Sequence, residues 1–355
     1  MKIITIIGAR PQFIKAAPVS RALSATGSLQ EIIIHTGQHF DDNMSRVFFD
    51  QMQIPRPDYN LAVHNLPHGA MTGRMLEAIE KVLTDEMPDY VLVYGDTNST
   101  LAGALAASKL HIPVAHVEAG LRSFNMKMPE EVNRILTDRI SSKLFCPTHT
   151  ARENLLKEGF EDFKAQILVT GDVMYDAALM FSEKSVKPGG ITVPDNFLLA
   201  TVHRQENTDD LSSLGSIIKS LNDISRHATL VFPVHPRTKN ILESKDLPPL
   251  SKEIICTSPL GYLEMLWLLK NCEMVVTDSG GMQKEAYFFG KPCITLREET
   301  EWTELVDAGY NKICGNDQAS IINAFDHFRR NKISFEPGLY GNGNAATKIA
   351  QALIK

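Results

Sequence analysis

The sequence has few cysteines and no pattern that would use them. Its five cysteines are widely spaced, and none lies in a Cys-x-x-Cys pair. We therefore expect neither a disulfide framework nor a structural zinc site, and we interpret the thiols as reduced and mostly buried.

Long apolar runs and an excess of positive charge are also absent. No run reaches the roughly 18 apolar residues that a membrane helix needs. The apolar run after Met1 is short and leads into Gly8 and Arg10, which does not fit a secretory signal. We expect a cytoplasmic protein with no membrane span. The formal net charge of −6 argues against nucleic acid or an anionic membrane as the main partner.

What the sequence does contain is a repeated alternation of short apolar runs and helical patterns. A chain of 355 residues favours two domains. Continuous apolar strands separated by helices are typical of parallel sheets covered on both faces. The candidate strands are 2–8, 31–37, 90–96, 113–120, 143–148, 197–204, 228–235, 253–259, 273–281 and 291–298. The candidate helices include 12–25, 41–52, 71–86, 98–109 and 210–226.

The alternation restarts after a segment rich in proline, glycine and polar residues at 183–196. We therefore predict two doubly wound, Rossmann-like α/β domains of similar size, over 1–175 and 176–343. Ligands of such sheets bind outside the carboxyl ends of the strands. The cleft between the two domains is accordingly the expected site.

Polar and small residues follow the predicted strands at this edge. The segment 277–290 ends an apolar strand, passes through two glycines and opens a helix. Such a turn lets backbone N–H groups approach a diphosphate at a helix N-terminus, and a carboxylate farther along the helix can accept ribose hydroxyls. The alternative is a simple glycine turn with an exposed glutamate. The residues concerned are Ser279, Gly280, Gly281 and Glu285.

Cations and carboxylates follow other strand ends. A Walker loop and a Gly-x-Gly-x-x-Gly motif are both absent, which argues against an ATPase or a dinucleotide dehydrogenase. The cations that suit a diphosphate are Arg10, Lys15, His203, Arg204, His235 and Arg237, unless they are ordinary surface charges. Neighbouring carboxylates with different pKa values can serve as acid and base. The candidates are Asp96, Glu118 and Glu130, with Arg134 placed to pair with Glu130. The alternative is an ion-pair network that only locks the loop.

Several long motifs resemble one enzyme family. They are "GARPQFIKAAPV", "HTGQHFD", "VYGDTNSTLAGALAA", "HVEAGLRS", "PEEVNRILTD", "ATVHRQEN", "FPVHPR" and "TDSGGMQKEA". In order and over nearly the whole chain, they resemble the non-hydrolysing UDP-N-acetylglucosamine 2-epimerases. "GARPQFIK", "RSFNMKMPEE" and "TEWTEL" look most like the branch that acts on UDP-2,3-diacetamido-2,3-dideoxyglucuronic acid for surface-polysaccharide synthesis.

The resemblance implies a glycosyltransferase-B architecture with UDP on the C-terminal domain and a last helix, about 344–355, that crosses back to the first domain. It implies C2 epimerisation through bound UDP and a 2-acetamido glycal, with no cofactor and no metal, in a homodimer. It implies that Asp96, Glu118, Glu130, His203 and Lys15 are catalytic. It implies substrate binding by Arg10, Arg134, His235, Ser279, Gly280, Gly281 and Glu285.

One departure from the family pattern bears on the hexose. Many members read Thr-Glu-Arg-Pro after the strand at 291–298, whereas this chain has Trp302 in place of the arginine. A different class of function on the same fold is a retaining glycosyltransferase, which needs an acceptor groove but no proton-transfer groups at C2. A catalytically silent UDP-sugar sensor and a hydrolysing epimerase are further alternatives.

Overall fold

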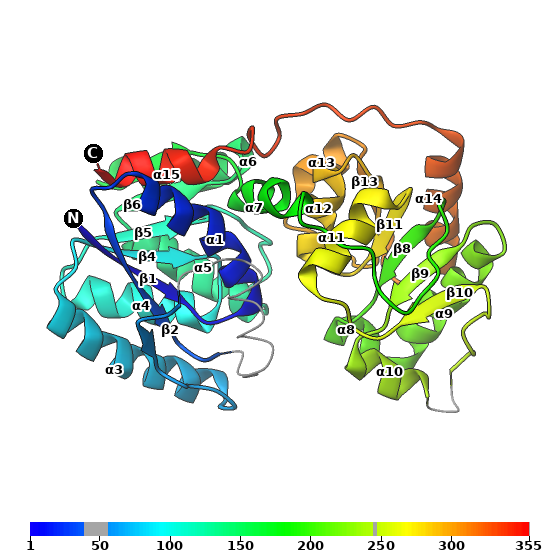
Figure 1. The fold of residues 1–355 in the computed structure, drawn as a ribbon, viewed down its shortest axis with the longest axis horizontal. Coiled ribbons are helices and arrows are strands. Elements are labelled where there is room, and N and C mark those ends of the chain that lie inside the picture. The colour runs from blue at the N-terminus through cyan, green and yellow to red at the C-terminus, as the bar shows by residue number, and fades with distance from the viewer. Residues whose placement is uncertain (39–55, 244–246, 355) are drawn as a thin grey trace. The chain divides into compact units, whose positions relative to one another are not determined.

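The computed structural model of the protein describes residues 1–38, 56–243 and 247–354, except for the side chains at positions 236 and 237. The helix expected over 41–52 lies outside the described residues. The chain divides into two compact units. The first comprises residues 1–179 and 337–355, and the second comprises residues 180–336. Each unit is a parallel sheet flanked by helices (Figure 1).

The first unit is built on a sheet with the order β3-β2-β1-β4-β5-β6-β7, in which every described pairing is parallel. Its strands are β1 (Lys2–Ile7), β2 (Gln30–His35), β3 (Tyr59–Asn60), β4 (Tyr90–Tyr94), β5 (Val114–Val117), β6 (Lys143–Cys146) and β7 (Gln166–Val169). The central strands are almost wholly buried because helices cover both of their faces.

The helices of the first unit connect these strands. They are α1 (Arg10–Ala25), α3 (His68–Glu86), α4 (Asn98–Lys109), α5 (Pro129–Ile140), α6 (His149–Lys157), the 3-10 turn η1 (Phe160–Asp162), α7 (Val173–Ser182) and α15 (Ala345–Ile354). Helices α3 and α4 pack together on one face of the sheet, and α1 packs with the C-terminal α15 on the other (Figure 1). The Asp176 carboxylate caps α15 by accepting from the N–H groups of Ala345 and Ala346. The last helix therefore belongs to the first unit.

The second unit repeats this topology. Its strands are β8 (Leu198–Thr201), β9 (Leu230–Pro233), β10 (Ile254–Thr257), β11 (Met274–Thr277), β12 (Cys293–Thr295) and β13 (Asn311–Ile313), in the order β10-β9-β8-β11-β12-β13. Its helices are α8 (Gln205–Thr208), α9 (Leu211–Ser225), α10 (Pro236–Leu242), α11 (Tyr262–Asn271), α12 (Gly280–Phe288), α13 (Thr303–Asp307) and α14 (Gln318–Arg330).

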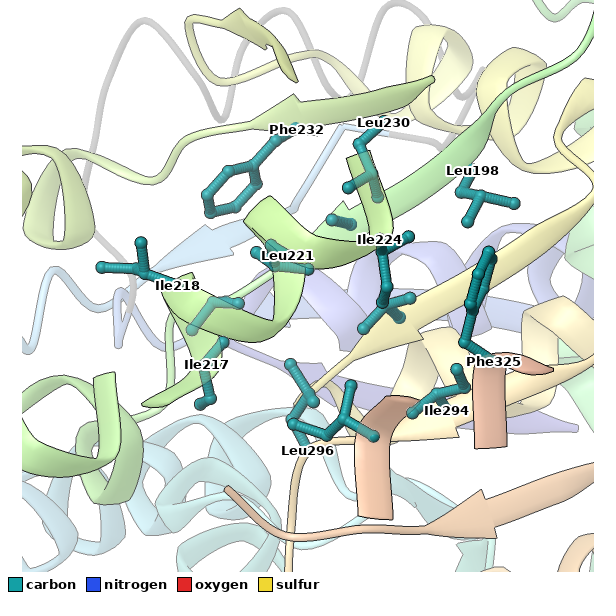
Figure 2. Packing of buried hydrophobic residues seen from close by; sticks show 14 of the residues in the cluster. Leu198, Ile217, Ile218, Leu221, Ile224, Leu230, Phe232, Ile294, Leu296 and Phe325 are labelled. Atoms are coloured by element: carbon teal, nitrogen blue, oxygen red, sulfur yellow. The ribbon is translucent and has the colours of Figure 1, made fainter. Parts of the chain in front are cut away.

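Helix α9 shows how the second unit is held together. Asp210 caps its N-terminus by accepting from the N–H groups of Ser212 and Ser213. Apolar side chains three and four residues apart then form one stripe, which packs on the strands and on α14 (Figure 2). The members of this stripe are Leu214, Ile217, Ile218, Leu221 and Ile224.

The structure confirms the α/β fold and each of the strands that the sequence predicted. Three short strands, β3, β7 and β13, were not predicted, and each lies at an outer edge of its sheet. The segment 183–196 contains no helix or strand. All five cysteines are free, and only Cys256 is exposed. None of the helices in the described ranges is both long enough and apolar enough to cross a membrane.

Both sheets reverse their strand order at one point, between β1 and β4 in the first unit and between β8 and β11 in the second. The loops that follow the two strands at such a point separate, one to each side, and leave a crevice in which ligands of open α/β sheets bind. In the first unit these loops carry Arg10 and Asp96. In the second they carry His203 and Ser279.

The turn after β1 yields a test of the fold. A Cβ atom at Gly8 would lie 1.9 Å from Thr36 Oγ1 and 2.4 Å from Ser99 Oγ. We expect Gly8→Ala to destabilise the protein by about 1–3 kcal/mol through this overlap. Gly73 lies on the exposed face of α3 with nothing within 4 Å of a Cβ. We expect Gly73→Ala to stabilise by about 0.5–1 kcal/mol. If urea unfolding shows that both substitutions change the free energy of unfolding in the same direction, this account is contradicted.

Candidate active site

In the first unit, Gln12 joins the two loops at the point where the strand order reverses. Its side-chain oxygen accepts from the N–H groups of Gly8, at 2.8 Å, and Ala9, at 3.0 Å. Its amide nitrogen donates to the Tyr94 carbonyl at 2.9 Å and to Thr100 Oγ1 at 3.0 Å. Gln12 is fully buried, so the start of α1 is fixed against the end of β4.

Glu118 and Lys15 form a buried ion pair above Gly95. The Lys15 ammonium contacts Glu118 Oε2, and a Cβ at Gly95 would lie 3.2 Å from that oxygen and 3.3 Å from Lys15 Nζ. Glu118 has a φ of 73°, which is costly for a residue with a Cβ. The strain is held in place because the N–H groups of Glu118 and Ala119 both donate to the Phe145 carbonyl.

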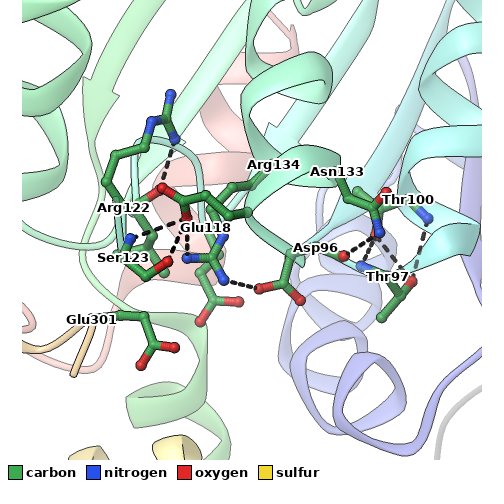
Figure 3. A network of polar contacts seen from close by, with 12 residues as sticks. Asp96, Thr97, Thr100, Glu118, Arg122, Ser123, Asn133, Arg134 and Glu301 are labelled. Atoms are coloured by element: carbon green, nitrogen blue, oxygen red, sulfur yellow. Dashed lines mark hydrogen bonds and ion pairs between the residues drawn. The ribbon is translucent and has the colours of Figure 1, made fainter. Parts of the chain in front are cut away.

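Asp96 is held by two residues of α5. Arg134 donates to Asp96 Oδ2 at 2.6 Å, and the Asn133 amide donates to the Asp96 carbonyl at 2.8 Å (Figure 3). The Asp96 side chain remains about one-third exposed at 32%. The carboxylate is thus oriented by a cation and still accessible to a ligand.

Glu131 is the second carboxylate that binds Arg134. It is fully buried, lies 2.9 Å from Arg134 Nη1, and accepts from the N–H groups of Ser123 and Phe124. The predicted pairing of Glu130 with Arg134 is wrong. Among the described residues Glu130 has no hydrogen-bond or ion-pair partner, and it is exposed at the start of α5. The helix turns Glu131, three residues before Arg134, toward the interior instead.

A second buried network lies beneath these loops and centres on Asp138. Asp138 Oδ1 lies 2.7 Å from His116 Nδ1, and Oδ2 accepts from Arg122 at 2.8 Å and from the Gly120 N–H at 3.1 Å. Arg122 also binds Glu158 through two nitrogens, at 2.6 Å and 2.9 Å. Burial works against charge on Asp138, but His116 and Arg122 outweigh it and lower the pKa of the carboxyl.

In the second unit, Asp278 organises the loop after β8. Its fully buried carboxylate accepts from the N–H groups of His203, at 2.9 Å, and Arg204, at 2.9 Å, and from the Asn207 amide at 3.2 Å. His203 Nδ1 lies 3.3 Å from Asp278 Oδ1 while the imidazole remains 42% exposed. The ring centroids of His203 and His235 are 6.0 Å apart.

Helix α12 begins directly after Asp278 and presents the predicted phosphate turn. Ser279 caps it, accepting from the Met282 N–H at 3.5 Å. No atom lies within 4 Å of the position of a Cβ at Gly281, so the packing of the unit does not itself require a glycine there. A ligand that approaches the first N–H groups of the helix would use this space.

Glu285 lies farther along the same helix and is mostly buried. Its Oε1 accepts from the Tyr262 hydroxyl at 3.1 Å. The neighbouring Lys284 is buried with its ammonium 4.0 Å from the centre of the Trp302 ring. Trp302, which replaces the arginine of many family members, therefore packs on α12 as a buried residue.

The structure brings several of the predicted residues into contact within each unit, but not Glu130. In the first unit Lys15 meets Glu118 and Arg134 meets Asp96, while Arg10 is half-buried at the start of α1. In the second, His203 and His235 lie beside each other, and Glu285 lies on the helix that the phosphate turn begins. Over 1–38, 56–243 and 247–354, no three His, Cys, Asp or Glu side chains are placed to hold a metal ion.

The sequence reasoning gave no role to three organising carboxylates: Glu131, Asp138 and Asp278. Glu131, Arg134 and Asp138 have the spacing of one helix face, and all three are buried. A charged stripe with the period of a buried face was the available signal. For Asp278 the signal was its position directly after a buried strand.

Two parallel sheets of this order, each flanked by helices and each with polar loops at the carboxyl ends of its strands, define an α/β enzyme of the glycosyltransferase-B type. The family model for UDP-N-acetylglucosamine 2-epimerase matches residues 21–354. The chain belongs to this family and is therefore an isomerase, a UDP-sugar 2-epimerase.

Individual relatives support the same conclusion. The chain is 56% identical over 356 residues to UDP-2,3-diacetamido-2,3-dideoxy-D-glucuronate 2-epimerase of Pseudomonas aeruginosa, with 100% of both chains covered. It resembles the crystal structure of the Methanocaldococcus jannaschii UDP-GlcNAc 2-epimerase in complex with UDP-GlcNAc and UDP, with a TM-score of 0.89, 43% identity and coverage of 100% and 99%. The Neisseria meningitidis UDP-GlcNAc 2-epimerase bound to UDP-GlcNAc gives a TM-score of 0.89 at 32% identity, with both chains fully covered at 100%.

The two contacts of Arg134 allow a direct test. A lysine at this position keeps the charge but lacks the planar fork that reaches both Glu131 and Asp96. We expect Arg134→Lys to lower the free energy of unfolding by about 1–3 kcal/mol. Arg330 forms an exposed ion pair with Asp326, so Arg330→Lys should change it by less than about 0.5 kcal/mol. Equal effects in urea unfolding would show that the buried fork is not needed.

Proposed function

We propose that the protein epimerises a UDP-N-acetylhexosamine-type sugar at C2 by elimination and re-addition of UDP. The observation that carries this proposal is the pair of carboxylates in the loops that follow the neighbouring strands β4 and β5, Asp96 and Glu118, each held by a cation. The C2 proton of the sugar is only weakly acidic, so the reaction needs a positioned base and a positioned acid. Asp96 and Glu118 are held in position before substrate binds.

The proposed reaction has two reversible halves. In the first, a carboxylate removes the C2 proton, the electron pair of the C2–H bond forms the C1–C2 double bond, and the C1–O bond breaks. UDP leaves with that bonding pair. In the second half, UDP adds back to C1 while a carboxylic acid delivers a proton to the opposite face of C2. We assign these proton transfers to Asp96, Glu118 and Glu130. We assign Lys15 to the electrostatic stabilisation of the charge that develops beside Glu118.

Departure of UDP places negative charge on the diphosphate, and the second unit has groups that suit it. The N-terminus of α12 at Ser279, Gly280 and Gly281 offers N–H groups and a favourable dipole. We assign His203 and His235 to the diphosphate as well. In the first unit we assign Arg10 to substrate binding. The proposal places the nucleotide on the second unit, whereas the proton transfers belong mainly to the first.

We propose that Glu285 accepts the ribose hydroxyls. Its carboxylate is on α12, it is nearly buried, and its Oε1 is oriented by the Tyr262 hydroxyl at 3.1 Å. The ribose is joined to the diphosphate, so its two hydroxyls lie near the helix that receives the diphosphate. A buried carboxylate on that helix suits them as an acceptor.

For the sugar we propose UDP-2,3-diacetamido-2,3-dideoxyglucuronate, as a precursor of surface polysaccharide. This is the substrate in the name of the Pseudomonas aeruginosa relative, which matches the whole chain at 56% identity. The presence of Trp302 in place of the usual arginine agrees with a sugar other than UDP-GlcNAc. The expected homodimer stays a prediction.

The reaction is tested by proton NMR in deuterated water with each UDP-sugar in turn. We expect the C2 proton to be replaced by deuterium as the second epimer forms, with the diacetamido uronate converted and UDP-GlcNAc left unchanged. Conversion of UDP-GlcNAc alone would overturn the sugar assignment. Absence of exchange with both sugars would overturn the proposed reaction.

Variants of the two carboxylates test the residue assignment. Asp96→Asn and Glu118→Gln should each lower kcat by at least about 100-fold, because an amide cannot take or deliver the C2 proton. Asp326→Asn, which alters an exposed carboxylate on α14, is the matched control and should leave kcat unchanged. Isothermal titration should show UDP affinity within a few-fold of wild type. Near-normal turnover in both variants would remove these residues from the mechanism.

The ribose assignment is tested separately. Glu285→Ala should weaken UDP binding by about 1–3 kcal/mol through the loss of charged hydrogen bonds. Asp326→Ala removes a carboxylate of the same unit from an exposed position and should leave UDP affinity unchanged. If calorimetry shows the same UDP affinity for Glu285→Ala and the control, Glu285 does not hold the ribose.

A further inference from the structure

The two carboxylates of the first unit lie on separate loops, and a buried pair links these loops. Gly95 directly precedes Asp96, and its carbonyl oxygen lies 2.7 Å from His116 Nε2. The other ring nitrogen of His116 lies 2.7 Å from Asp138 Oδ1. Asp138 Oδ2 accepts in turn from the N–H of Gly120, two residues after Glu118.

These contacts place an acceptor at each ring nitrogen of His116. The Gly95 carbonyl oxygen can only accept a hydrogen bond. The Asp138 carboxylate, which already accepts from Arg122 and Gly120, can also only accept while it is ionised. With Asp138 ionised, the two ring nitrogens of His116 face two acceptors, the Asp138 carboxylate and the Gly95 carbonyl. Arg122 completes the cluster by pairing with both Asp138 and the partly exposed Glu158.

We infer that Asp138 is a positioning residue that holds the loops of Asp96 and Glu118 at a fixed spacing. It fixes the first loop through the ring of His116 and the second through the Gly120 N–H. The second loop packs closely against α6, since a Cβ at Gly120 would lie 2.3 Å from the Ala151 carbonyl oxygen. This loop therefore has little room to shift if its contact with Asp138 is lost.

The spacing matters because both carboxylates must reach the same carbon. Proton removal and proton delivery at C2 need reacting atoms within hydrogen-bond reach of the substrate. A displacement of about 1 Å between loops can lower a rate about 100-fold. Asp138 has no exposed surface and lies beneath the loops, so it acts through their backbone and not on the substrate.

The hydrogen bonds predict different results for two substitutions at this position. Asp138→Ala removes every contact and should lower kcat by about 100-fold. Asp138→Asn can keep them all: its oxygen accepts from Arg122 and Gly120, and its amide donates to Nδ1 of a neutral His116, whose Nε2–H still reaches Gly95. We expect this variant to retain kcat within about tenfold of wild type, with the KM of both variants within about threefold.

The matched control is Asp176→Ala. Asp176 is another buried carboxylate of the first unit that accepts two main-chain N–H bonds, from the start of α15. Its loss should lower the melting temperature but leave kcat within about threefold of wild type. A fall in kcat that follows the melting temperature equally in Asp138→Ala and Asp176→Ala would reduce Asp138 to a structural role and overturn the inference.

If Asp138→Ala does not fold, His116→Ala serves for the same comparison, since it cuts the link to Gly95 and leaves Asp138 paired with Arg122. A kcat within about threefold of wild type in whichever variant folds would overturn the inference. A fall in kcat in Asp138→Asn as large as that in Asp138→Ala would also overturn the inference, because the charge of Asp138 and not its hydrogen bonds would then be decisive.

The inference rests on the proposed roles of Asp96 and Glu118, and the two can fail separately. If Asp96→Asn and Glu118→Gln keep wild-type turnover, the proposed function fails whatever Asp138 does. If those two variants are inactive and Asp138→Ala turns over normally, only the positioning role fails.

Discussion

The loops of the first unit depend on the pairing of charges that have been removed from water. A buried charge costs several kcal/mol unless it is paired and hydrogen-bonded. Glu131, Arg134 and Asp138 are buried on one face of α5, and each is paired with a residue outside that helix. These pairs pull the loops after β4 and β5 onto α5. Most of the charged residues that follow the apolar strand β5 therefore serve to fix this edge of the sheet.

The second unit has the same strand order and solves the corresponding problem with one residue. Asp278 follows β11 and binds the backbone N–H groups of the loop after β8. The rings of His203 and His235 lie at the same edge, and the His203 ring also lies 3.3 Å from Asp278. In the proposed function the first unit supplies carboxylates that move a proton, and the second supplies cations and a helix N-terminus for a diphosphate.

Much of the fold was predictable, because buried parallel strands are continuous apolar runs and these are plain in the sequence. The edge strands β3 and β13 are short and partly polar, and β7 is only half-buried, so periodicity did not distinguish them from loops. Strand ends located Asp96, Glu118 and His203 without knowledge of the fold.

The sequence did not show which side of α5 faces inward. The sequence offered Glu130 and Glu131 as neighbours with equal chemistry. The choice between them depends on the rotation of α5 about its axis, which packing against the loop at Ser123 and Phe124 decides. The link from Asp138 to Gly95 was equally hidden, because it passes through residues far apart in the sequence and one main-chain carbonyl.

The central claim, made as a proposal, is that C2 is inverted by release and re-addition of UDP. It is tested most directly with a UDP-sugar carrying oxygen-18 in the bridge between C1 and the β-phosphorus. If the C1–O bond breaks, the freed β-phosphate rotates and its oxygens exchange positions before re-addition. The account predicts that the label spreads from the bridge to the non-bridging positions as the epimers interconvert. Epimerisation with the label retained wholly in the bridge would contradict it.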